Sequence, residues 1–156
     1  PLVFNSTTLI KGKNKIELEA NSNYSMNIDY FLINIPDNIT LSRGELVHTH
    51  TYVDNRCSCG AYSFEAENGE ITGICTDNND GFILERNSSN SRPTSGGKCV
   101  GNWSNKGNKI IWKFSLDKET KVSMNLYYAP GMDGEKNINE ALSLKLNDQE
   151  VSYKTT

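Results

Sequence analysis

The sequence predicts an all-β fold, an antiparallel β-sandwich. Nearly every apolar run alternates with polar residues at period two, as in "KIIWKFSL" and "KVSMNLYY". Such runs are typical of strands that turn one face to a core and the other to water. Turn-forming stretches such as "NKGN" and "LNDQ" separate them, and repeated half-buried strands without long helical patterns favour a sandwich. The 156 residues give room for one ordinary domain with a core, so we expect a single domain over 1–156.

Two strands are predicted near the front of the chain. In "NKIELEA", Ile16, Leu18 and Ala20 alternate with glutamates, which predicts a strand over 14–20. In "NIDYFLIN", over 27–34, a single carboxylate, Asp29, stands between bulky apolar neighbours. An ionisable group among apolar residues requires a partner or a purpose.

Residues 36–61 differ from the strand-rich segments on either side. They contain one short strand candidate, "ELVHTHTYV", but otherwise resemble a connector, and a connector of this length is uncommon inside a compact domain. Residues 86–97, "RNSSNSRPTSGG", are so rich in Ser, Asn and Gly that we expect a surface loop.

The strands predicted after the connector all have a core face. Within 62–67, Tyr62, Phe64 and Ala66 take that face, and Glu65 and Glu67 project together from the other. Further inward-facing sets are Ile110, Trp112, Phe114 and Leu116; then Val122, Met124, Leu126 and Tyr128; then Leu142, Leu144 and Leu146.

Composition and missing motifs exclude several classes of function. The formal net charge of −3 argues against a nucleic-acid partner, which normally leaves a basic stripe. No run is long or apolar enough for a transmembrane helix. The chain opens on "PLVFNSTT" without a signal-like segment, so we expect a mature protein or an excised fragment. Without G-x-S-x-G, H-E-x-x-H, a P-loop or an evident pair of opposed carboxylates, we expect no enzyme activity.

Several motifs resemble the galactose-binding-like, jelly-roll β-sandwich carbohydrate-binding modules, in particular families six and thirty-five. From Tyr62 onward, "YSFEAENGEITG", "SGGKCVGNW", "KVSMNLYYAP" and "NEALSLKLNDQEV" follow the order of those modules. Their closing pieces, a G-x-N-x-I-x-L segment and an N-I-D-Y strand, are present as "LIKGKNKIELEA" and "NIDYFLI", but at residues 9–33.

The resemblance therefore implies a circularly permuted or self-complementing sandwich. Residues 1–35 would supply the closing strands, 36–61 a connector, and 62–156 the opening and central strands. A repeat cut out of phase from a tandem array, or strand exchange with a neighbour, would also fit. We favour a self-completing domain, in which the strands at 14–20 and 27–34 pair with strands of 62–156 in the same chain.

The resemblance also implies a structural calcium ion. Modules of this kind bind it through the glutamates of E-A-E and the aspartate of N-I-D-Y, which correspond to Glu65, Glu67 and Asp29. Hard oxygen ligands suit calcium, and two like charges side by side are unfavourable without a cation. The alternative is that both glutamates are solvated and Asp29 caps a turn.

Aromatic side chains are the candidate sugar-binding residues. Flat rings cover the C–H face of a pyranose, and amides bind its hydroxyl pairs. Trp103 lies in the turn-rich "GNWSNKG"; the alternative is that it covers a loop as an apolar lid. Tyr24 and Asn27 match the family's loop-tip positions, and Tyr128 could wall the same cleft. Trp112 is predicted to be core.

The four cysteines favour disulfides over zinc, because "CSC" and two isolated cysteines lack the paired knuckles of a zinc site. A Cys75–Cys99 bridge would staple the polar loop and contribute roughly 3 kcal/mol. Cys57 and Cys59 would then pair with each other or stay reduced, and pairing of "CSC" with the other two stays open. Disulfides and N-x-S/T sequons together indicate a secreted protein.

The functional hypothesis is a non-catalytic, secreted carbohydrate-binding module, stabilised by calcium, that tethers an attached enzyme or surface to a plant cell-wall or other polysaccharide. The rival is a protein-binding scaffold repeat. It would be cohesin-like in role and would capture dockerin-bearing enzymes, as in the cellulosome scaffoldins of anaerobic fungi, whose Asn- and Lys-rich β-sandwich repeats this chain resembles. A plain spacer repeat would bind neither ligand. "HTH" places His48 and His50 on one side of an extended segment, but two ligands make only a weak metal site.

Overall fold

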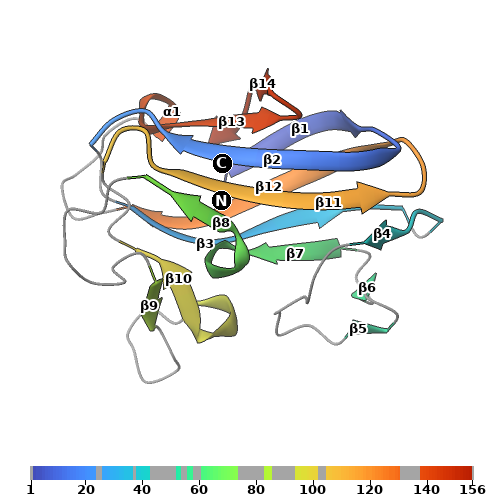
Figure 1. Cartoon of the computed structure of the whole chain (residues 1–156), viewed down its shortest axis with the longest axis horizontal. Helices are drawn as coiled ribbons and strands as arrows, with labels where there is room; N and C mark the ends of the chain where they lie inside the picture. The colour runs from blue at the N-terminus through green and yellow to red at the C-terminus, as the bar shows by residue number, and fades with distance from the viewer. Residues whose placement is uncertain are drawn as a thin grey trace.

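The chain forms an antiparallel β-sandwich in a computed structural model that describes residues 2–23, 26–36, 38–42, 52–53, 56–57, 61–73, 83–85, 94–101, 105–130 and 138–155. Two sheets, here called sheet A and sheet B, pack face to face (Figure 1). The predicted fold class is confirmed.

Sheet A contains seven of the described strands. Its order is β15 (Lys154–Thr155), β1 (Leu2–Leu9), β12 (Thr120–Pro130), β3 (Met26–Asn34), β10 (Lys98–Val100) and β9 (Ile83–Glu85), and β7 (Ala61–Glu65) also pairs with β3. One edge of β3 is therefore shared by two short strands, because β7 pairs along Tyr30–Asn34 and β10 pairs at Ile28.

Sheet B contains six described strands. Its order is β14 (Gln149–Val151), β13 (Leu142–Leu146), β2 (Gly12–Ala20), β11 (Lys109–Leu116) and β4 (Leu41–Ser42), and β8 (Glu70–Thr72) also pairs with β11. β13 and β14 form a hairpin through Asn147 and Asp148, whose φ angles of 48° and 67° suit a two-residue type I′ turn.

The remaining described elements are short. β5 (Tyr52–Val53) and β6 (Arg56–Cys57) form a separate hairpin, η1 (Ala66–Asn68) and η2 (Ser95–Gly97) are single 3₁₀ turns, and α1 is Ile138–Ala141. In the described part of the chain, no helix has the length and apolar character needed to span a membrane.

The core lies between the two sheets and follows the period-two pattern. Every second residue of β2, β11 and β13 is buried, so the inward-facing sets predicted for these strands are confirmed. Aromatic rings connect the layers: Phe31 of sheet A lies 5.8 Å from Trp112 of sheet B, and Phe64 lies 5.1 Å from Phe114, measured between ring centroids. Trp112 is 4 % exposed, which confirms its predicted core role.

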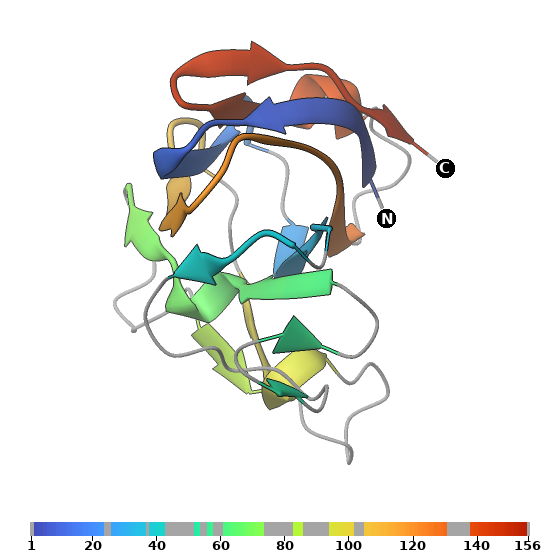
Figure 2. The same ribbon diagram turned by 90° about the vertical axis from the view of Figure 1, so that its right-hand side faces the viewer.

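The two early strands pair with later strands of the same chain, as predicted. β2 lies between β11 and β13, with Trp112 opposite Ile16 and Leu144 opposite Leu18. β3 lies between β12 on one side and β7 and β10 on the other. Figure 2 shows the blue N-terminal strands next to the red C-terminal ones, where β15 pairs with β1.

The predicted connector contributes strands to the fold. β4 pairs with the end of β11, which places Leu41 opposite Leu116. Of the strand candidate "ELVHTHTYV", only Tyr52–Val53 is described, and it forms β5; the rest lies outside the described residues.

Candidate functional site: a buried carboxylate cluster

Asp29 occupies an irregular position in β3. Tyr127 and Tyr128 are consecutive in β12, but they lie opposite Tyr30 and Ile28, so Asp29 is an extra residue without a partner in the register. An extra residue of this kind is a β-bulge, which redirects side chains. As a result Asp29 stands at the edge of β3 where β7 ends and β10 begins.

Glu65 and Glu67 come to the same place from a different part of the chain. Glu65 ends β7 and lies opposite Tyr30. We predicted Glu67 on the same strand as Glu65, but it lies in the 3₁₀ turn η1 that follows the strand. The strand ends here because Ala66 is buried and the chain turns through Gly69, whose N–H donates to the Ala66 carbonyl at 3.1 Å.

A turn from the polar loop covers the carboxylates. The Ser95 N–H donates to Asp29 Oδ1 at 3.0 Å and lies 3.3 Å from Oδ2. The Ser95 hydroxyl donates to Glu65 Oε1 at 2.9 Å, and the Ser63 hydroxyl donates to the same oxygen at 3.0 Å. Gly96, at φ 60°, gives η2 the left-handed backbone that the turn requires. η1 and η2 lie near each other on one side of the sandwich in Figure 1.

Ser95 and Ser63 were missed by the sequence analysis. Ser95 falls in the loop predicted to be plain surface, and Ser63 falls on the non-core face of a strand. The signal that could have indicated Ser95 is "SGG", because adjacent glycines before a strand mark a tight turn that can approach other groups closely.

Burial dominates the electrostatics of the cluster. Burial raises the pKa of Asp29 to about 7. The hydrogen bond from the Ser95 N–H lowers this pKa, and the charge of Glu67 raises it further. Burial also raises the pKa of Glu65 to about 7. Hydrogen bonds from the hydroxyls of Ser95 and Ser63 lower this pKa, and the charges of Glu67 and Asp29 raise it. The charges of neighbouring carboxyl groups therefore add to the effect of burial, and the hydrogen bonds to Asp29 and Glu65 do not offset it.

Glu65 is the most constrained member. Its side chain is 1 % exposed, and Oε2 has no hydrogen-bond partner within the described residues. Its backbone carbonyl accepts a hydrogen bond from the Trp112 indole N–H at 3.0 Å, which ties the end of β7 to sheet B. A buried carboxylate oxygen without a donor is costly, so this position suits a cation or a proton.

The side chains alone do not form a closed metal site. Among the described residues, no group of three or more His, Cys, Asp or Glu side chains is placed to hold a metal ion. Calcium takes six to eight oxygen ligands and readily includes main-chain carbonyls and water. A cation here would therefore need such oxygens beside the carboxylates, and the unpartnered Glu65 Oε2 fits that requirement.

The predicted sugar-binding residues are only partly described. Asn27 lies opposite Ala129 on the outer side of sheet A. Next to it is Gly101, where an added Cβ would be 3.0 Å from Asn27 Oδ1. Tyr128 is half-buried and packs against the core cluster, so it points to the other side of the sheet from Asn27. Tyr24 and Trp103 lie outside the described residues.

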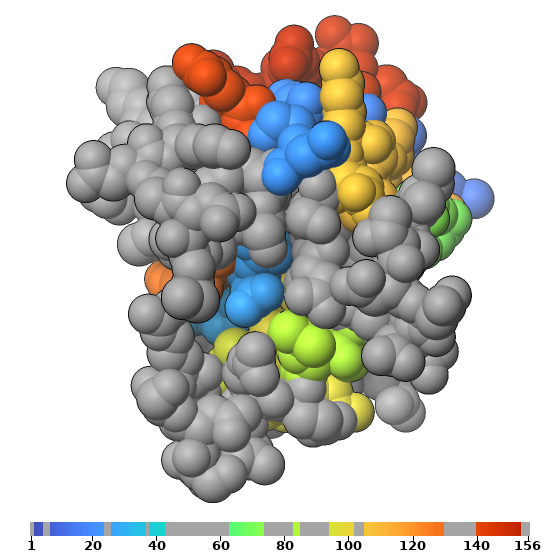
Figure 3. Space-filling view, turned by 90° about the vertical axis from the view of Figure 1, so that its left-hand side faces the viewer, coloured from blue at the N-terminus to red at the C-terminus, as the bar shows by residue number. Residues whose placement is uncertain are grey.

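Figure 3 shows one end of the sandwich, where atoms of the early strands and the lime-green atoms of β9 reach the surface. Trp103 follows Gly101 by two residues in the sequence, and Tyr24 precedes Met26 by two.

An aromatic pair near the carboxylates was not predicted. Tyr30 and Tyr127 stack with centroids 4.3 Å apart and planes 11° apart on the outer face of sheet A. Burial raises the pKa of Tyr30 well above its ordinary value, with contributions from Tyr127, Asp29 and Glu65. The phenol therefore stays protonated beside the carboxylates.

The cysteine and histidine predictions remain untested. Cys99 is buried on β10 at 1 % exposure. Cys75, Cys59 and the side chain of Cys57 lie outside the described residues, as do His48 and His50. The Cys75–Cys99 bridge stays a prediction.

No protein-family model, curated protein or solved structure matches this chain. The resemblance to carbohydrate-binding modules therefore depends on the quoted motifs, and the candidate site depends on the geometry of the cluster.

Proposed function

We propose that this chain is a non-catalytic, secreted carbohydrate-binding module that is stabilised by calcium and tethers an attached enzyme or surface to a polysaccharide. The observation that carries the proposal is the carboxylate cluster. Asp29, from β3, lies beside Glu65 and Glu67, whose segment follows more than thirty positions later in the printed sequence. That arrangement is the one the motif resemblance implies.

Calcium would offset the burial and mutual repulsion of the ionised carboxylates in this cluster. Glu65 Oε2, with Glu67 and Asp29, would hold the ion, and main-chain or water oxygens would complete its shell. A bound cation would favour the ionised carboxylates that burial otherwise disfavours. It would also fix the end of β7 against η2, since the Ser95 turn already contacts two of the three carboxylates.

Sugar binding would use the end of the sandwich next to this cluster. Trp103 and Tyr24 are the proposed ring platforms, and Asn27 supplies an amide on the outer side of sheet A. Tyr128 would act mainly through packing, because its ring lies against the core. The Tyr30–Tyr127 stack, half-buried on the same outer face, adds an aromatic surface beside Asn27.

A glycan array with the purified chain, with and without calcium, tests the proposal. Trp103→Ala and Tyr24→Ala are expected to lose about tenfold in affinity, since an aromatic contact is worth about 0.5–1.5 kcal/mol beyond the area it buries. Tyr153→Phe is the matched control, because it changes an aromatic residue whose ring contacts Phe4 in the core region. It should leave binding unchanged.

The same experiment separates the rival function. A chain that binds no glycan but captures a purified dockerin-bearing enzyme would be a scaffold repeat. A chain that binds neither would contradict both proposals, while calcium binding alone would leave only the structural part of the proposal.

A further inference from the structure

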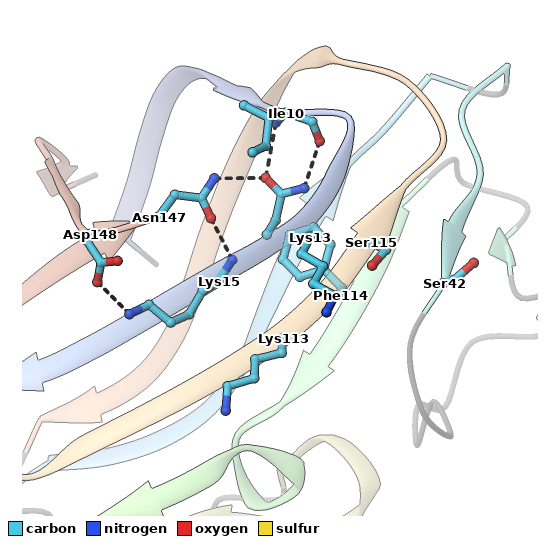
Figure 4. A pocket seen from close by; sticks show the side chains of 10 residues that line it. Ile10, Lys13, Lys15, Ser42, Lys113, Phe114, Ser115, Asn147 and Asp148 are labelled. Atoms are coloured by element: carbon cyan, nitrogen blue, oxygen red, sulfur yellow. Dashed lines mark hydrogen bonds and ion pairs between the residues drawn. The ribbon is translucent and has the colours of Figure 1, made fainter.

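A second candidate site lies on the outer face of sheet B, away from the carboxylate cluster. It is a pocket of about 600 Å³ between the β1–β2 turn, β11, β4 and the β13–β14 turn (Figure 4). Pockets of roughly 300–1,000 Å³ are the usual size for small-molecule or single-sugar sites.

The walls of the pocket are fixed by the side-chain amides of Asn14, which is buried, and Asn147, which is partly buried. Asn14 is 2 % exposed; its Oδ1 accepts from the Ile10 N–H at 3.1 Å and from Asn147 Nδ2 at 3.0 Å. Its Nδ2 donates to the carbonyls of Ile10, at 2.8 Å, and Gly12, at 3.1 Å. Asn147 Oδ1 accepts from the Lys15 N–H at 2.7 Å. The two turns are therefore locked together, and the pocket is preformed.

The groups that face the pocket are mainly hydrogen-bond donors with positive charge. Lys13 lies opposite Ser115 in the register, and Ser115 lies opposite Ser42, so a lysine and two hydroxyls share one row. Lys113 follows on the same face of β11, opposite Lys15. Figure 4 shows the Lys13 and Lys113 side chains on adjacent strands of this face.

The charges are not balanced within the pocket. Asp148 is the one carboxylate among its described lining residues, and it is paired with Lys15. Within the described residues no ion pair is found for Lys13, which is exposed. Lys113 pairs with Glu70 at 2.8 Å, but both side chains are more than half exposed, and exposed pairs contribute little.

Two other lysines on the same face of sheet B already form ion pairs with glutamates. Lys109 lies 3.0 Å from Glu17, and Lys145 lies 3.2 Å from Glu19. The positive charge available to a ligand is therefore concentrated at Lys13 and Lys113, although the chain as a whole carries −3. Ile10, 45 % exposed at the rim, adds an apolar contact suited to the C–H face of a sugar.

We propose that this pocket binds a sugar unit carrying a carboxylate or sulfate group, through Lys13 and Lys113 with hydroxyl contacts from Ser42 and Ser115. The site uses none of the residues proposed above for sugar binding and does not depend on them. It would direct the protein to acidic rather than neutral polysaccharides.

Isothermal titration at low salt, in EDTA, tests the proposal with matched charged and neutral ligands. Oligogalacturonides are compared with their fully methyl-esterified forms, and dextran sulfate with dextran; the two pairs distinguish carboxylate from sulfate. Binding is expected only for the anionic member of at least one pair. Lys13→Ala and Lys113→Ala should each weaken it about tenfold, the usual value of a charge-assisted hydrogen bond.

Two further variants keep the test specific. Lys121→Ala removes an exposed lysine of equal charge on sheet A and should leave the affinity unchanged. Glu70→Gln removes the competing partner of Lys113 and should tighten binding. The proposal is overturned if neither anionic ligand binds, or if Lys121→Ala weakens binding as much as Lys13→Ala. Glycan binding that is lost only in Trp103→Ala would retain the proposed function and overturn this second site.

Discussion

Glu65 connects several elements around the candidate site, because its carbonyl and its Oε1 accept hydrogen bonds from different elements. Its carbonyl accepts from Trp112 in sheet B, and its Oε1 accepts from Ser63 and Ser95. The motif resemblance predicted Glu65 and Asp29 as members of one site, and Ser95 contacts both carboxylates. The motifs could not reveal the burial of Glu65, because the covering turn comes from a Ser- and Gly-rich loop that pattern analysis assigns to the surface.

Stability without calcium is expected to fall as the pH rises from about 4 to about 7. The pKa values of Asp29 and Glu65 rise from 3.8 and 4.5 to about 7 on folding, so the folded chain binds more protons than the unfolded chain in this window. The stabilisation from the protonated carboxyls is complete below the unfolded values and is lost through pH 7. Thermal melts in EDTA across pH 4–8 measure it. Asp29→Asn should flatten the profile, and an unchanged slope in that variant would contradict the assignment.

Calcium is expected to reverse this loss at neutral pH. An ion present at a hundred times its Kd stabilises by about 2.7 kcal/mol, and it should release protons on binding because it requires ionised carboxylates. Calorimetry in two buffers of different ionisation enthalpy measures the proton release. Glu65→Gln should abolish the heat, whereas Glu70→Gln, an exposed carboxylate on β8, should retain it. No heat with the wild-type chain would exclude the calcium site.

Trp112→Phe should lower both stability and calcium affinity. Phe keeps an aromatic ring in the core but is smaller than Trp, so a cavity adds to the loss of stability. The Glu65 carbonyl also loses its donor, and an unsatisfied buried acceptor costs about 1–3 kcal/mol. Phe114→Leu, which changes core packing around Phe64 but removes no hydrogen bond to Glu65, is the control and should change stability alone. Urea unfolding and calcium titration separate the two effects. Equal calcium affinity in both variants would show that the hydrogen bond does not position Glu65.

At the scale of strands, the length of the alternation decided what could be predicted. β2, β11 and β12 carry long period-two runs and β13 a shorter one, and the structure confirms all four. β3 was also predicted, although its alternation breaks at Asp29. β8, β9 and β10 are three residues each, too short to show a period. β1 is longer, but its register shifts between Phe4 and Thr7, which interrupts the alternation and hid the strand.

The outer face of β2 carries a network of ion pairs between glutamates and lysines, which the alternation of apolar and polar residues does not predict. Glu17 points away from the core, yet it is only 7 % exposed because lysines cover it. Burial raises its pKa, but the hydrogen bond and charge of Lys109, with the charges of Lys15 and Lys145, outweigh burial and leave the pKa lowered.

Glu17→Gln is therefore expected to destabilise the fold by about 1–2 kcal/mol, since three lysines lose a shared, nearly buried negative charge. Glu70→Gln, which breaks an exposed pair with Lys113, should change stability by less than about 0.5 kcal/mol. Denaturant unfolding at pH 7 compares them. Raising the salt concentration should reduce the difference in unfolding free energy between the two variants. A larger loss of stability in Glu70→Gln than in Glu17→Gln would contradict the network.

At the scale of the whole molecule, the strands nearest the two ends of the described chain are neighbours. Leu2 lies opposite Thr155, and Val3 lies opposite Lys154, in the β1–β15 pair. Meanwhile β2 and β3 occupy interior positions of sheet B and sheet A. The fold therefore closes on itself irrespective of the order in which its segments are translated, which is the property a permuted arrangement requires.

A circular permutant is expected to fold to the same sandwich. Joining residues 156 and 1 with a short Gly/Ser linker spans a small distance, because Leu2 and Thr155 are paired and paired Cα atoms lie about 4.5–5.5 Å apart. Opening the chain between Ser42 and Tyr52 would then place the 61–156 strands first and β1, β2 and β3 last, the order of the modules it resembles. The unfolding free energy should stay within about 1–2 kcal/mol, because only loop-closure terms change.

The control opens the joined chain between Ile111 and Trp112, inside β11, which pairs with β2 over its whole length. That variant should fail to fold, because the break divides a central strand of sheet B. Circular dichroism, size exclusion and urea unfolding compare the two permutants. If the first is unfolded or forms dimers while the unpermuted chain is monomeric, the order of the segments is essential to the fold, and the permutation hypothesis is wrong.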